Sequence, residues 1–315
     1  MYSKMFSRWT ASIIVLLMSI ASSTTSSVAA EGGASNYIPG GYGNFGVAIA
    51  PAPGFYFQND VFYYSGDASV SALSGNRSAS LETEVYVEMM TGLWATEHKV
   101  FGAQYATGVI LPVVSAELSG TITAGPLAGS ASGSRSGLGD MGFIPASLYW
   151  TLSPNFHVNL AEIIIAPTGD YSTSRLLNMG RNYWSFDTVL SATYMTDTGT
   201  EFSAVAGFML NTENPDTNYQ TGSEFHLDWM VNQFFSETFA LGVQGYVYRQ
   251  ISGDSGSGAT LGDFKGSANG IGGAIMWVPI INERPVKLVA KVMHEFGVER
   301  RFKGTWGQFQ FGFKF

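Results

Sequence analysis

Residues 224–231 read EFHLDWMV, and their alternation decides the class of fold. Phe225, Leu227, Trp229 and Val231 alternate with Glu224, His226, Asp228 and Met230. Successive side chains of a β-strand point to opposite faces, so this stretch has one apolar, aromatic face and one charged face. A helix would place Glu224 and Asp228 on the same side as Phe225 and would bury no clean apolar face. The stretch therefore predicts a strand.

The same two-residue period recurs along most of the chain, for example at 82–93, 184–194 and 286–296. About twelve such segments occur, near 55–64, 82–95, 100–112, 138–152, 156–166, 183–196, 201–211, 222–235, 239–250, 267–279, 286–297 and 304–315. The step Ala161-Glu162 breaks the alternation of the fifth segment, which indicates either a bulge there or a different register for this strand. Most segments have the length of tilted membrane strands, so we expect an all-β protein of about twelve strands.

The links between these segments alternate in length. Short links at 96–99, 153–155, 197–200, 236–238 and 280–285 separate longer, Gly/Ser/Asn-rich links at 65–81, 113–137, 167–182, 212–221, 251–266 and, marginally, 298–303. Outer-membrane barrels have short periplasmic turns and longer outer loops. The links therefore predict a transmembrane, antiparallel, up-and-down β-barrel with both termini in the periplasm.

The composition suits a membrane barrel better than a soluble enzyme. Of the 315 residues, 45% are hydrophobic and only 13% are charged, whereas globular chains average about 25% charged residues. Beyond residue 30 no apolar run approaches the roughly 20 residues of a transmembrane helix, and a closed barrel is the other structure that can span a bilayer. The formal net charge of −8 leaves no basic patch for nucleic acid. The absence of cysteine excludes disulfides and thiolate metal sites.

The first thirty residues have the features of a secretory signal peptide. Lys4 and Arg8 precede the apolar run 13–20, and the small residues Ala29 and Ala30 suggest cleavage before Glu31. We therefore expect a signal peptide at 1–30, a Gly/Pro-rich segment at 31–54 and a barrel at 55–315. Such a protein would be exported to the bacterial outer membrane.

The C-terminus carries an aromatic face with a period of two. Phe309, Phe311, Phe313 and the terminal Phe315 alternate with Gln308, Gln310, Gly312 and Lys314. A soluble protein that ended on such an edge would invite aggregation. The pattern resembles the C-terminal signal by which bacterial outer-membrane proteins are recognised for barrel assembly. This implies two partners, the barrel-assembly machinery and outer-membrane lipid; the number of subunits stays open.

Parity along the strands nominates residues for the inside of the barrel. Polar side chains that alternate with apolar ones should face the lumen, where charges can pair across a narrow interior. The predicted lumen residues are Glu82, Glu84, Glu88, Asp187, Glu224, His226, Asp228, Gln244, Lys287, Lys291 and Glu295.

The segment 31–54 is too rich in Gly and Pro for a strand, yet it holds several aromatic residues. Tyr37, Tyr42 and Phe45, with Tyr56 just beyond, could offer a stacking surface to apolar solutes. We expect this segment to pack at the periplasmic mouth and partly occlude it. A free periplasmic leader is the alternative.

Several motifs together resemble a known family. They are the opening at 31–40, the turn at 51–56, Gly137-Leu138-Gly139-Asp140, Ala166-Pro167-Thr168-Gly169-Asp170-Tyr171, the stretch 178–184, and the region 246–254. Together they are similar to the family of the MetA pathway of phenol degradation, and the Gly-Asp pieces also resemble long-chain fatty-acid transporter barrels. The resemblance covers essentially the whole mature chain. It implies an outer-membrane, transporter-like barrel that takes up small, often hydrophobic or aromatic molecules, and it supplies no catalytic residues.

The sequence favours a passive channel that needs no cofactor, and three other functions compete with this interpretation. Glu224, His226 and Asp228 share a strand face and could hold a metal, although a hydrogen-bonded lumen cluster explains them more simply. A lipid-modifying enzyme of the phospholipase type needs a serine within hydrogen-bond reach of a histidine. His294 has outward parity, whereas Ser191 and Ser203 have inward parity, so no catalytic triad assembles from parity. A structural or adhesion barrel is the remaining alternative.

Overall fold

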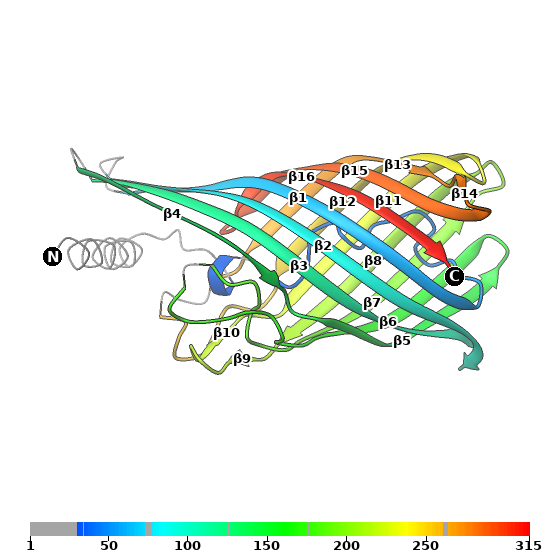
Figure 1. Ribbon diagram of the computed structural model, residues 1–315, viewed down its shortest axis with the longest axis horizontal. Coiled ribbons are helices and arrows are strands. Elements are labelled where there is room, and N and C mark those ends of the chain that lie inside the picture. The colour runs from blue at the N-terminus through cyan, green and yellow to red at the C-terminus, as the bar shows by residue number, and fades with distance from the viewer. Residues whose placement is uncertain (1–29, 34, 73–76, 125–126, 176, 261–263) are drawn as a thin grey trace.

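The computed structural model describes residues 30–33, 35–72, 77–124, 127–175, 177–260 and 264–315, and it is a closed antiparallel β-barrel (Figure 1). Twelve strands form the wall, as the alternation predicts. None of the helical structure in these ranges is long and apolar enough to cross a membrane.

The elements have the following bounds. They are η1 Glu31–Gly33, β1 Gly54–Ala72, β2 Arg77–Val100, β3 Ala103–Ala124, β4 Leu127–Leu138, β5 Gly142–Ser153, β6 Phe156–Ile165, β7 Ser185–Met195, β8 Thr200–Asn211, β9 Glu213–Asn214, β10 Tyr219–Gln220, β11 Glu224–Ser236, β12 Phe239–Gln250, β13 Ser267–Trp277, β14 Ile280–Ile281, β15 Arg284–Glu299 and β16 Lys303–Lys314.

Neighbouring strands in the chain are neighbours in the wall, and β1 pairs with β16 to close it. The small strands β9, β10 and β14 lie outside this cycle. β4 and β5 act together as one wall strand, because both pair with β3, β4 with 113–124 and β5 with 104–110. The interruption at 139–141 is bridged by a hydrogen bond from the N–H of Gly139 to the carbonyl of Pro112.

Three predicted links are strands instead. The short link predicted at 96–99 is the end of β2, and the turn to β3 lies at 101–102. The links predicted at 65–81 and 113–137 are mostly extensions of β1, β2, β3 and β4, which project together beyond the rest of the barrel (Figure 1). Their small Ser, Thr, Ala and Gly residues have the composition of a loop. Cross-strand pairing holds them extended, since β2 pairs with β3 from Arg77 onward and β3 pairs with β4 up to Ala124.

The predicted bulge at Ala161-Glu162 is absent from β6, which pairs with β7 in unbroken register over 156–165. Ala161 keeps the lumen parity of the buried Asn159 and Ile163, and Glu162 points outward and accepts a hydrogen bond from Thr188. The irregularity belongs to the neighbouring strand, where the register between β5 and β6 shifts between Phe143 and Ala146. Pro145 lies in that interval, and proline has no N–H to contribute to a ladder.

The outward face carries aromatic residues at two levels. Tyr63 and Tyr86 pack together near the projecting end of β1 and β2, with ring centroids 4.7 Å apart. Phe55 and Trp94 stack at the other end of the same strands, 5.5 Å apart. Eight residues of β2 separate Tyr86 from Trp94, which is about 26 Å along the strand. This spacing suits the two aromatic girdles of a membrane barrel.

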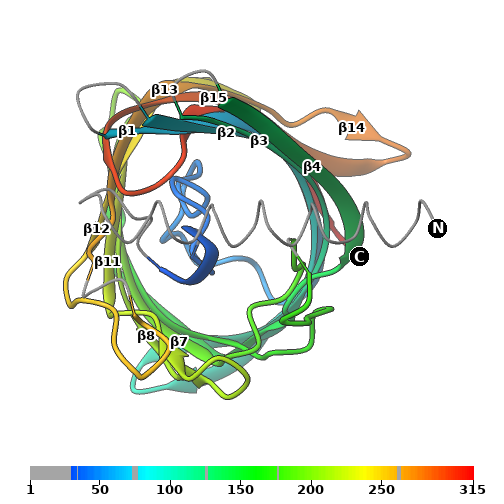
Figure 2. The same ribbon diagram turned by 90° about the vertical axis from the view of Figure 1, so that its left-hand side faces the viewer.

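The two ends of the barrel differ. We call the end with β9, β10 and the projecting strands the long-loop end, and the other the short-turn end (Figure 1). The barrel domain starts and finishes at the short-turn end, where the N–H of Phe315 donates to the carbonyl of Phe55. The residues before β1 do not stay there. The stretch 35–53, which we call the inner segment, runs inside the ring of strands, and η1 lies near the long-loop end (Figures 1 and 2).

Candidate functional site

The inner segment is attached to one side of the lumen. Residues 35–49 make hydrogen bonds to side chains of β7, β8, β11, β15 and β16. We call the lumen side of these strands, with β12 and β13 between β11 and β15, the polar wall. Among the described residues, 35–50 make no hydrogen bond to β1–β6, and the inner segment first reaches that side at Pro51, whose carbonyl accepts a hydrogen bond from Gln104 of β3 at 2.8 Å. The segment therefore divides the lumen into two unlike sides.

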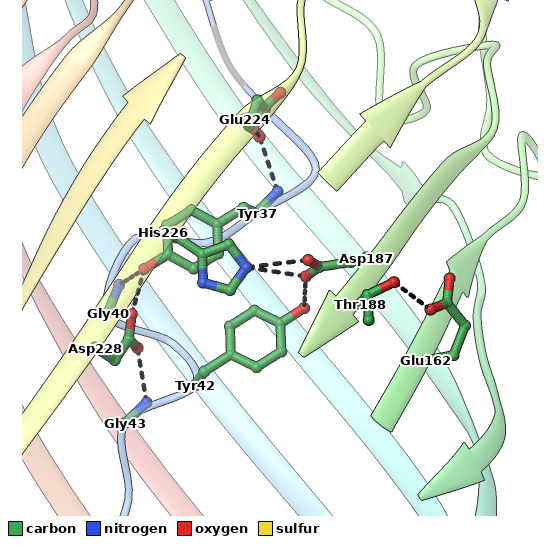
Figure 3. Close-up of polar contacts among 11 residues, drawn as sticks. Tyr37, Gly40, Tyr42, Gly43, Glu162, Asp187, Thr188, Glu224, His226 and Asp228 are labelled. Atoms are coloured by element: carbon green, nitrogen blue, oxygen red, sulfur yellow. Dashed lines mark hydrogen bonds and ion pairs between the residues drawn. The ribbon is translucent and has the colours of Figure 1, made fainter. Parts of the chain in front are cut away.

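A stacked aromatic cluster lies at the centre of the polar wall (Figure 3). The ring of Tyr37 lies 4.0 Å from the imidazole of His226, at an interplanar angle of 14°. The ring of Tyr42 lies 5.0 Å from the same imidazole. The hydroxyl of Tyr42 donates to Asp187 at 2.8 Å, and Nε2 of His226 lies 3.1 Å from both oxygens of that carboxylate. All of His226 and Asp187 is buried, so these contacts act without competition from water.

A glycine on the intervening strand makes this contact possible. His226 is on β11 and Asp187 is on β7, so the imidazole must cross β8 to reach the carboxylate. Gly207 of β8 is the cross-strand partner of His226, and a Cβ built on it would lie 2.0 Å from Nε2. Any other residue at this position would displace the ring.

Two charged residues hold the turn of the inner segment at 40–43. Asp228 accepts hydrogen bonds from the hydroxyl of Tyr37 and, at 2.8 Å, from the N–H of Gly43. Nζ of Lys291 donates to the carbonyls of Gly40, at 3.1 Å, and Gly43, at 2.5 Å. Gly40 has φ +75°, and a Cβ there would meet the rings of Tyr246 and Trp306 at 2.7 and 2.8 Å. Charge and close packing therefore fix the turn together.

The attachment continues toward the short-turn end. Glu201 accepts the N–H of Gly46 at 2.9 Å, and Lys287 donates to the carbonyl of Phe45 at 3.0 Å. Asn44 donates to Gln310 of the last strand at 3.0 Å. Five strands, β7, β8, β11, β15 and β16, therefore take part in holding the segment.

The opposite side of the lumen, formed by β2, β3, β5 and β6, carries mainly apolar side chains, with the hydrogen-bonded Asn159 and Ser147 among its polar ones, and we call it the apolar wall. Val87 and Met89 pack, partly buried, against the cluster that contains Tyr37 and Trp306. Ile110 and Ile144 pack, also partly buried, beside Ile163. No charged side chain anchors the segment on this side, among the residues that the structure describes.

The motifs that resemble the transporter families meet at the break between β4 and β5. Asp140 accepts the N–H groups of Gly169, at 2.8 Å, and Arg181, at 2.6 Å. A Cβ on Gly169 would lie 2.6 Å from the Cα of Gly180, so the two chain segments approach too closely for a side chain. Three separate motifs thus form one latch that fixes the connection from β6 to β7 over the break.

The neighbouring Asp170 binds two guanidinium groups, those of Arg175 and Arg135. Their hydrogen bonds, that of Arg175 above all, hold the pKa of the Asp170 carboxyl below its ordinary value. This side chain is substantially exposed, so the contact ties the connection to β4 only weakly.

Most of the predicted lumen residues lie on the polar wall. They are Asp187, Glu224, His226, Asp228, Gln244, Lys287, Lys291 and Glu295. Glu224 accepts hydrogen bonds from Ser35 and Asn211, and Glu295 accepts them from Tyr64 and Tyr246.

Glu82, Glu84 and Glu88 lie on the outward face of β2, so the prediction had this strand's faces reversed. Glu88 is the cross-strand partner of the exposed Val61, whereas Val87 packs into the lumen. The charges tolerate this position for two reasons. Glu82 and Glu84 lie beyond the aromatic level of Tyr63 and Tyr86, toward the projecting end of β2. Glu88 accepts a hydrogen bond from Asn59 at 2.9 Å.

The predicted stacking residues divide into two groups. Tyr37 and Phe45 are buried, Tyr37 against His226 and Tyr248 and Phe45 against Phe234, so neither offers a free ring face. Tyr42 is partly exposed, and Tyr56 lies partly exposed on β1, where its hydroxyl donates to the carbonyl of Ala52. The segment itself passes through the lumen rather than only across the mouth. The terminal Phe309 and Phe315 face outward, as the period of two requires.

Some site residues escaped the sequence analysis. Asp60 and Glu201 accept hydrogen bonds inside the lumen, as do Asp140 and Asp254 nearer the loops. Strand parity could have found Glu201, which alternates with Phe202. Asp140 had a signal in its Gly-rich motif, but its partners are 29 and 41 residues away.

Within the described ranges, the side chains assemble neither a metal site nor the serine–histidine pair of a lipid-modifying enzyme. No group of three or more His, Asp and Glu side chains there could hold a metal ion. Ser191 and Ser203 are buried in the lumen, while His294 is exposed on the outside, where its Nδ1 lies 3.0 Å from the hydroxyl of Thr305. No serine hydroxyl among these residues is hydrogen-bonded to a histidine.

A solved structure shares this fold. An outer membrane channel from Pseudomonas putida F1 superposes with a TM-score of 0.64 at 15% identity, over 86% of this chain and 99% of that one. A FadL homologue from Pseudomonas aeruginosa gives a TM-score of 0.41 at 11% identity, over 82% of this chain and 89% of that one. No curated protein matches the sequence.

The sequence does match a protein family. Residues 62–311, nearly the whole barrel, match the family described as putative MetA-pathway of phenol degradation. The match includes the latch at Asp140 and the polar wall, and excludes the inner segment. The chain therefore belongs to the family of the putative MetA pathway of phenol degradation.

Proposed function

We propose that the protein is a passive channel of the bacterial outer membrane that carries small, apolar or aromatic molecules along the apolar wall. Its family and its barrel fold support the general function. Its outward aromatic levels support the location. Transport would be downhill and would use no cofactor.

The observation that carries the proposal is the two-sided lumen. The inner segment is bonded to the polar wall, so the charges of that wall are used in holding it. The partly exposed Val87, Met89, Ile110 and Ile144 face it from the other side. An apolar solute passing there desolvates no charge, whereas a polar solute finds few hydrogen-bond partners.

The test measures entry of two probes into intact cells that produce the protein. N-phenyl-1-naphthylamine is an apolar aromatic dye that fluoresces on reaching the inner membrane, and nitrocefin is a polar probe hydrolysed by a periplasmic β-lactamase. Production of the channel should raise the rate for the dye several-fold more than the rate for nitrocefin. Equal acceleration of both would argue against an apolar path.

Two variants locate the path. Ile144→Asn should lower dye entry and leave nitrocefin entry unchanged, while the matched Ile144→Leu should behave like the native protein. Excising residues 32–50 should raise both rates and the single-channel conductance in planar bilayers, and should abolish the preference for the dye. If excision changes neither conductance nor preference, the inner segment takes no part in selection.

The same preparation separates a channel from a lipid-modifying enzyme. Purified protein in vesicles should release no fatty acid while it conducts. Lipid hydrolysis lost on substitution of His294 would favour the enzyme.

A further inference from the structure

A buried carboxylate at the long-loop end has only neutral partners. Asp254, between β12 and β13, is 4% exposed. Its Oδ1 accepts hydrogen bonds from the N–H of Gly222, at 3.1 Å, and from Gln250, at 2.6 Å. Its Oδ2 accepts from the hydroxyl of Tyr219, at 2.5 Å, and from the N–H of Ala30, at 3.1 Å. No cationic side chain of the described residues pairs with it, and a buried anion without a cation is costly.

The next residue, Glu31, is bound through both its side chain and its backbone N–H. The side chain of Glu31 accepts hydrogen bonds from Thr217 and Asn214, each at 2.8 Å. Its backbone N–H donates to the hydroxyl of Thr221 at 3.3 Å. These partners come from the connection between β8 and β11, and Tyr171 of the connection between β6 and β7 lies 3.5 Å from the same carboxylate. Such contacts select one side chain at one place in the chain.

We propose that Asp254, Thr221, Thr217 and Asn214 form a receptor for the chain's own processed N-terminus, which binds the α-ammonium and the side-chain carboxylate of Glu31. The proposal rests on cleavage of the signal peptide after Ala30 and is independent of the transported solute. Hydrolysis of the Ala30–Glu31 bond consumes one water, leaves a carboxylate on Ala30 and gives Glu31 a protonated amine.

Cleavage replaces a neutral hydrogen-bond donor near Asp254 with a positively charged one. Departure of Ala30 removes one donor from Oδ2 of Asp254, and the new ammonium forms one residue away, about 3.8 Å along the Cα trace. A charge-assisted hydrogen bond then replaces a neutral one and neutralises the buried anion. The uncleaved chain has only the neutral contact. Processing would therefore complete the attachment of the inner segment at its outer end.

The receptor also joins three connections that are separate in sequence. Glu31 links the connection between β6 and β7 to that between β8 and β11, and Asp254 adds the one between β12 and β13. A bound terminus would draw these loops together over the inner segment. Loss of the ammonium contact should loosen all three.

The experiment measures how fast the α-amine reacts. N-terminal sequencing of the protein purified from outer membranes should first return Glu31. The folded protein is then treated with an N-hydroxysuccinimide acetate ester at pH 7.5, and acetylation of the N-terminal peptide is followed by mass spectrometry. We expect the amine to react at least ten-fold more slowly in the folded protein than in denaturant. An ordinary α-amino group has a pKa of about 7.7–8.0, so its ammonium pairing in the fold should also raise the pH needed for reaction.

Two variants test the receptor against a matched control. Asp254→Asn should restore most of the reactivity of the unfolded chain, and Glu31→Ala, which removes the side chain that Thr217 and Asn214 bind, should restore part of it. Asp216→Asn removes an exposed carboxylate from the same loop region and should leave the amine protected. Folding of each variant is checked by heat-modifiable migration. If Asp254→Asn fails to fold, two other measurements test the proposal. They are the amine reactivity of folded Thr221→Val, which should rise, and the difference in reactivity between folded and denatured native protein.

Three results would overturn the proposal. One is an N-terminus other than Glu31. Another is equal acetylation of folded and denatured native protein. The third is an amine that stays protected in folded Asp254→Asn, or in folded Thr221→Val where that variant has to decide.

Discussion

The two walls of the lumen are built from strands with the same alternation, but these strands turn opposite faces, charged or apolar, toward the lumen. On the polar wall, the apolar face of each strand lies outward and the charged face holds the inner segment, as Asp228 and Lys291 do. On β2 of the apolar wall the charged face lies outward, and Val87 and Met89 turn inward. A period of two defines two faces but not which one faces the lumen. What decides is the surroundings of each face.

The largest expected effect tests the direction of those faces. The chain has no cysteine, so single cysteines can be labelled without background. Glu84→Cys on the outward face should react fully with a membrane-impermeant maleimide in intact cells, because residue 84 lies beyond the aromatic level of Tyr63 and Tyr86. Ser191→Cys, buried on the polar wall, should stay unlabelled until residues 32–50 are excised. Labelling of both in the native background would contradict the assignment of the faces.

The next effect tests whether the polar wall holds the segment. Asp228→Ala leaves the hydroxyl of Tyr37 and the N–H of Gly43 without an acceptor, which should lower the free energy of unfolding by about 2–4 kcal/mol. Conductance in planar bilayers should rise with it. The counterpart on the other wall, Met89→Ala, removes no hydrogen bond and should leave conductance unchanged. A rise in both variants would show that filling volume, not bonding, retains the segment.

A smaller effect tests the seat of the imidazole. Gly207→Ala places a methyl group where Nε2 of His226 lies, and should lower the free energy of unfolding by about 1–3 kcal/mol. Gly273→Ala is the control, because the nearest atom to its added Cβ is a carbonyl oxygen at 4.0 Å. That variant should be neutral or slightly stabilising. Urea titration followed by tryptophan fluorescence compares the two.

The smallest effect concerns the loop that covers the break beside the apolar wall. The folded protein lowers the pKa of Asp170, so the charged carboxylate stabilises the loop above its ordinary pKa of about 3.9. This contribution should disappear as the pH falls through the lower folded value. Asp170→Asn should mimic the acid state at neutral pH and speed trypsin cleavage after Arg175. Asp216→Asn should not, and equal cleavage of all three proteins would mean that the guanidinium contacts leave the loop no better held.

The sequence predicts the barrel well because every strand must satisfy the same constraint. Each backbone group needs a partner within the wall and each outward side chain meets lipid, so alternation and the terminal phenylalanines carry the information locally. The extensions of β1–β4 continue past the level of Tyr63 and Tyr86, and the constraint set by lipid does not apply to strands beyond an aromatic girdle. Their Ser- and Gly-rich composition therefore resembles that of a loop, although pairing between strands keeps them extended.

The candidate site was less predictable because its contacts join distant parts of the chain. Parity places Asp187 and His226 on inner faces, but only the absence of a side chain at Gly207 lets them meet across a strand. Tyr37 and Tyr42 were expected to face a passing solute, and their position against His226 depends on where the inner segment runs. No local pattern encodes that path.

The route of the inner segment also constrains the order in which the protein folds. Residue 44 is bonded to residue 310 and residue 40 to residue 291, separations of 266 and 251 positions. Contacts this distant carry a large loop-closure entropy and form slowly. The inner segment, which leaves the ribosome before any strand of the barrel, therefore reaches its final place only after the last strands are available. Assembly should end with threading of the N-terminus, and that step should govern how soon a new barrel becomes selective.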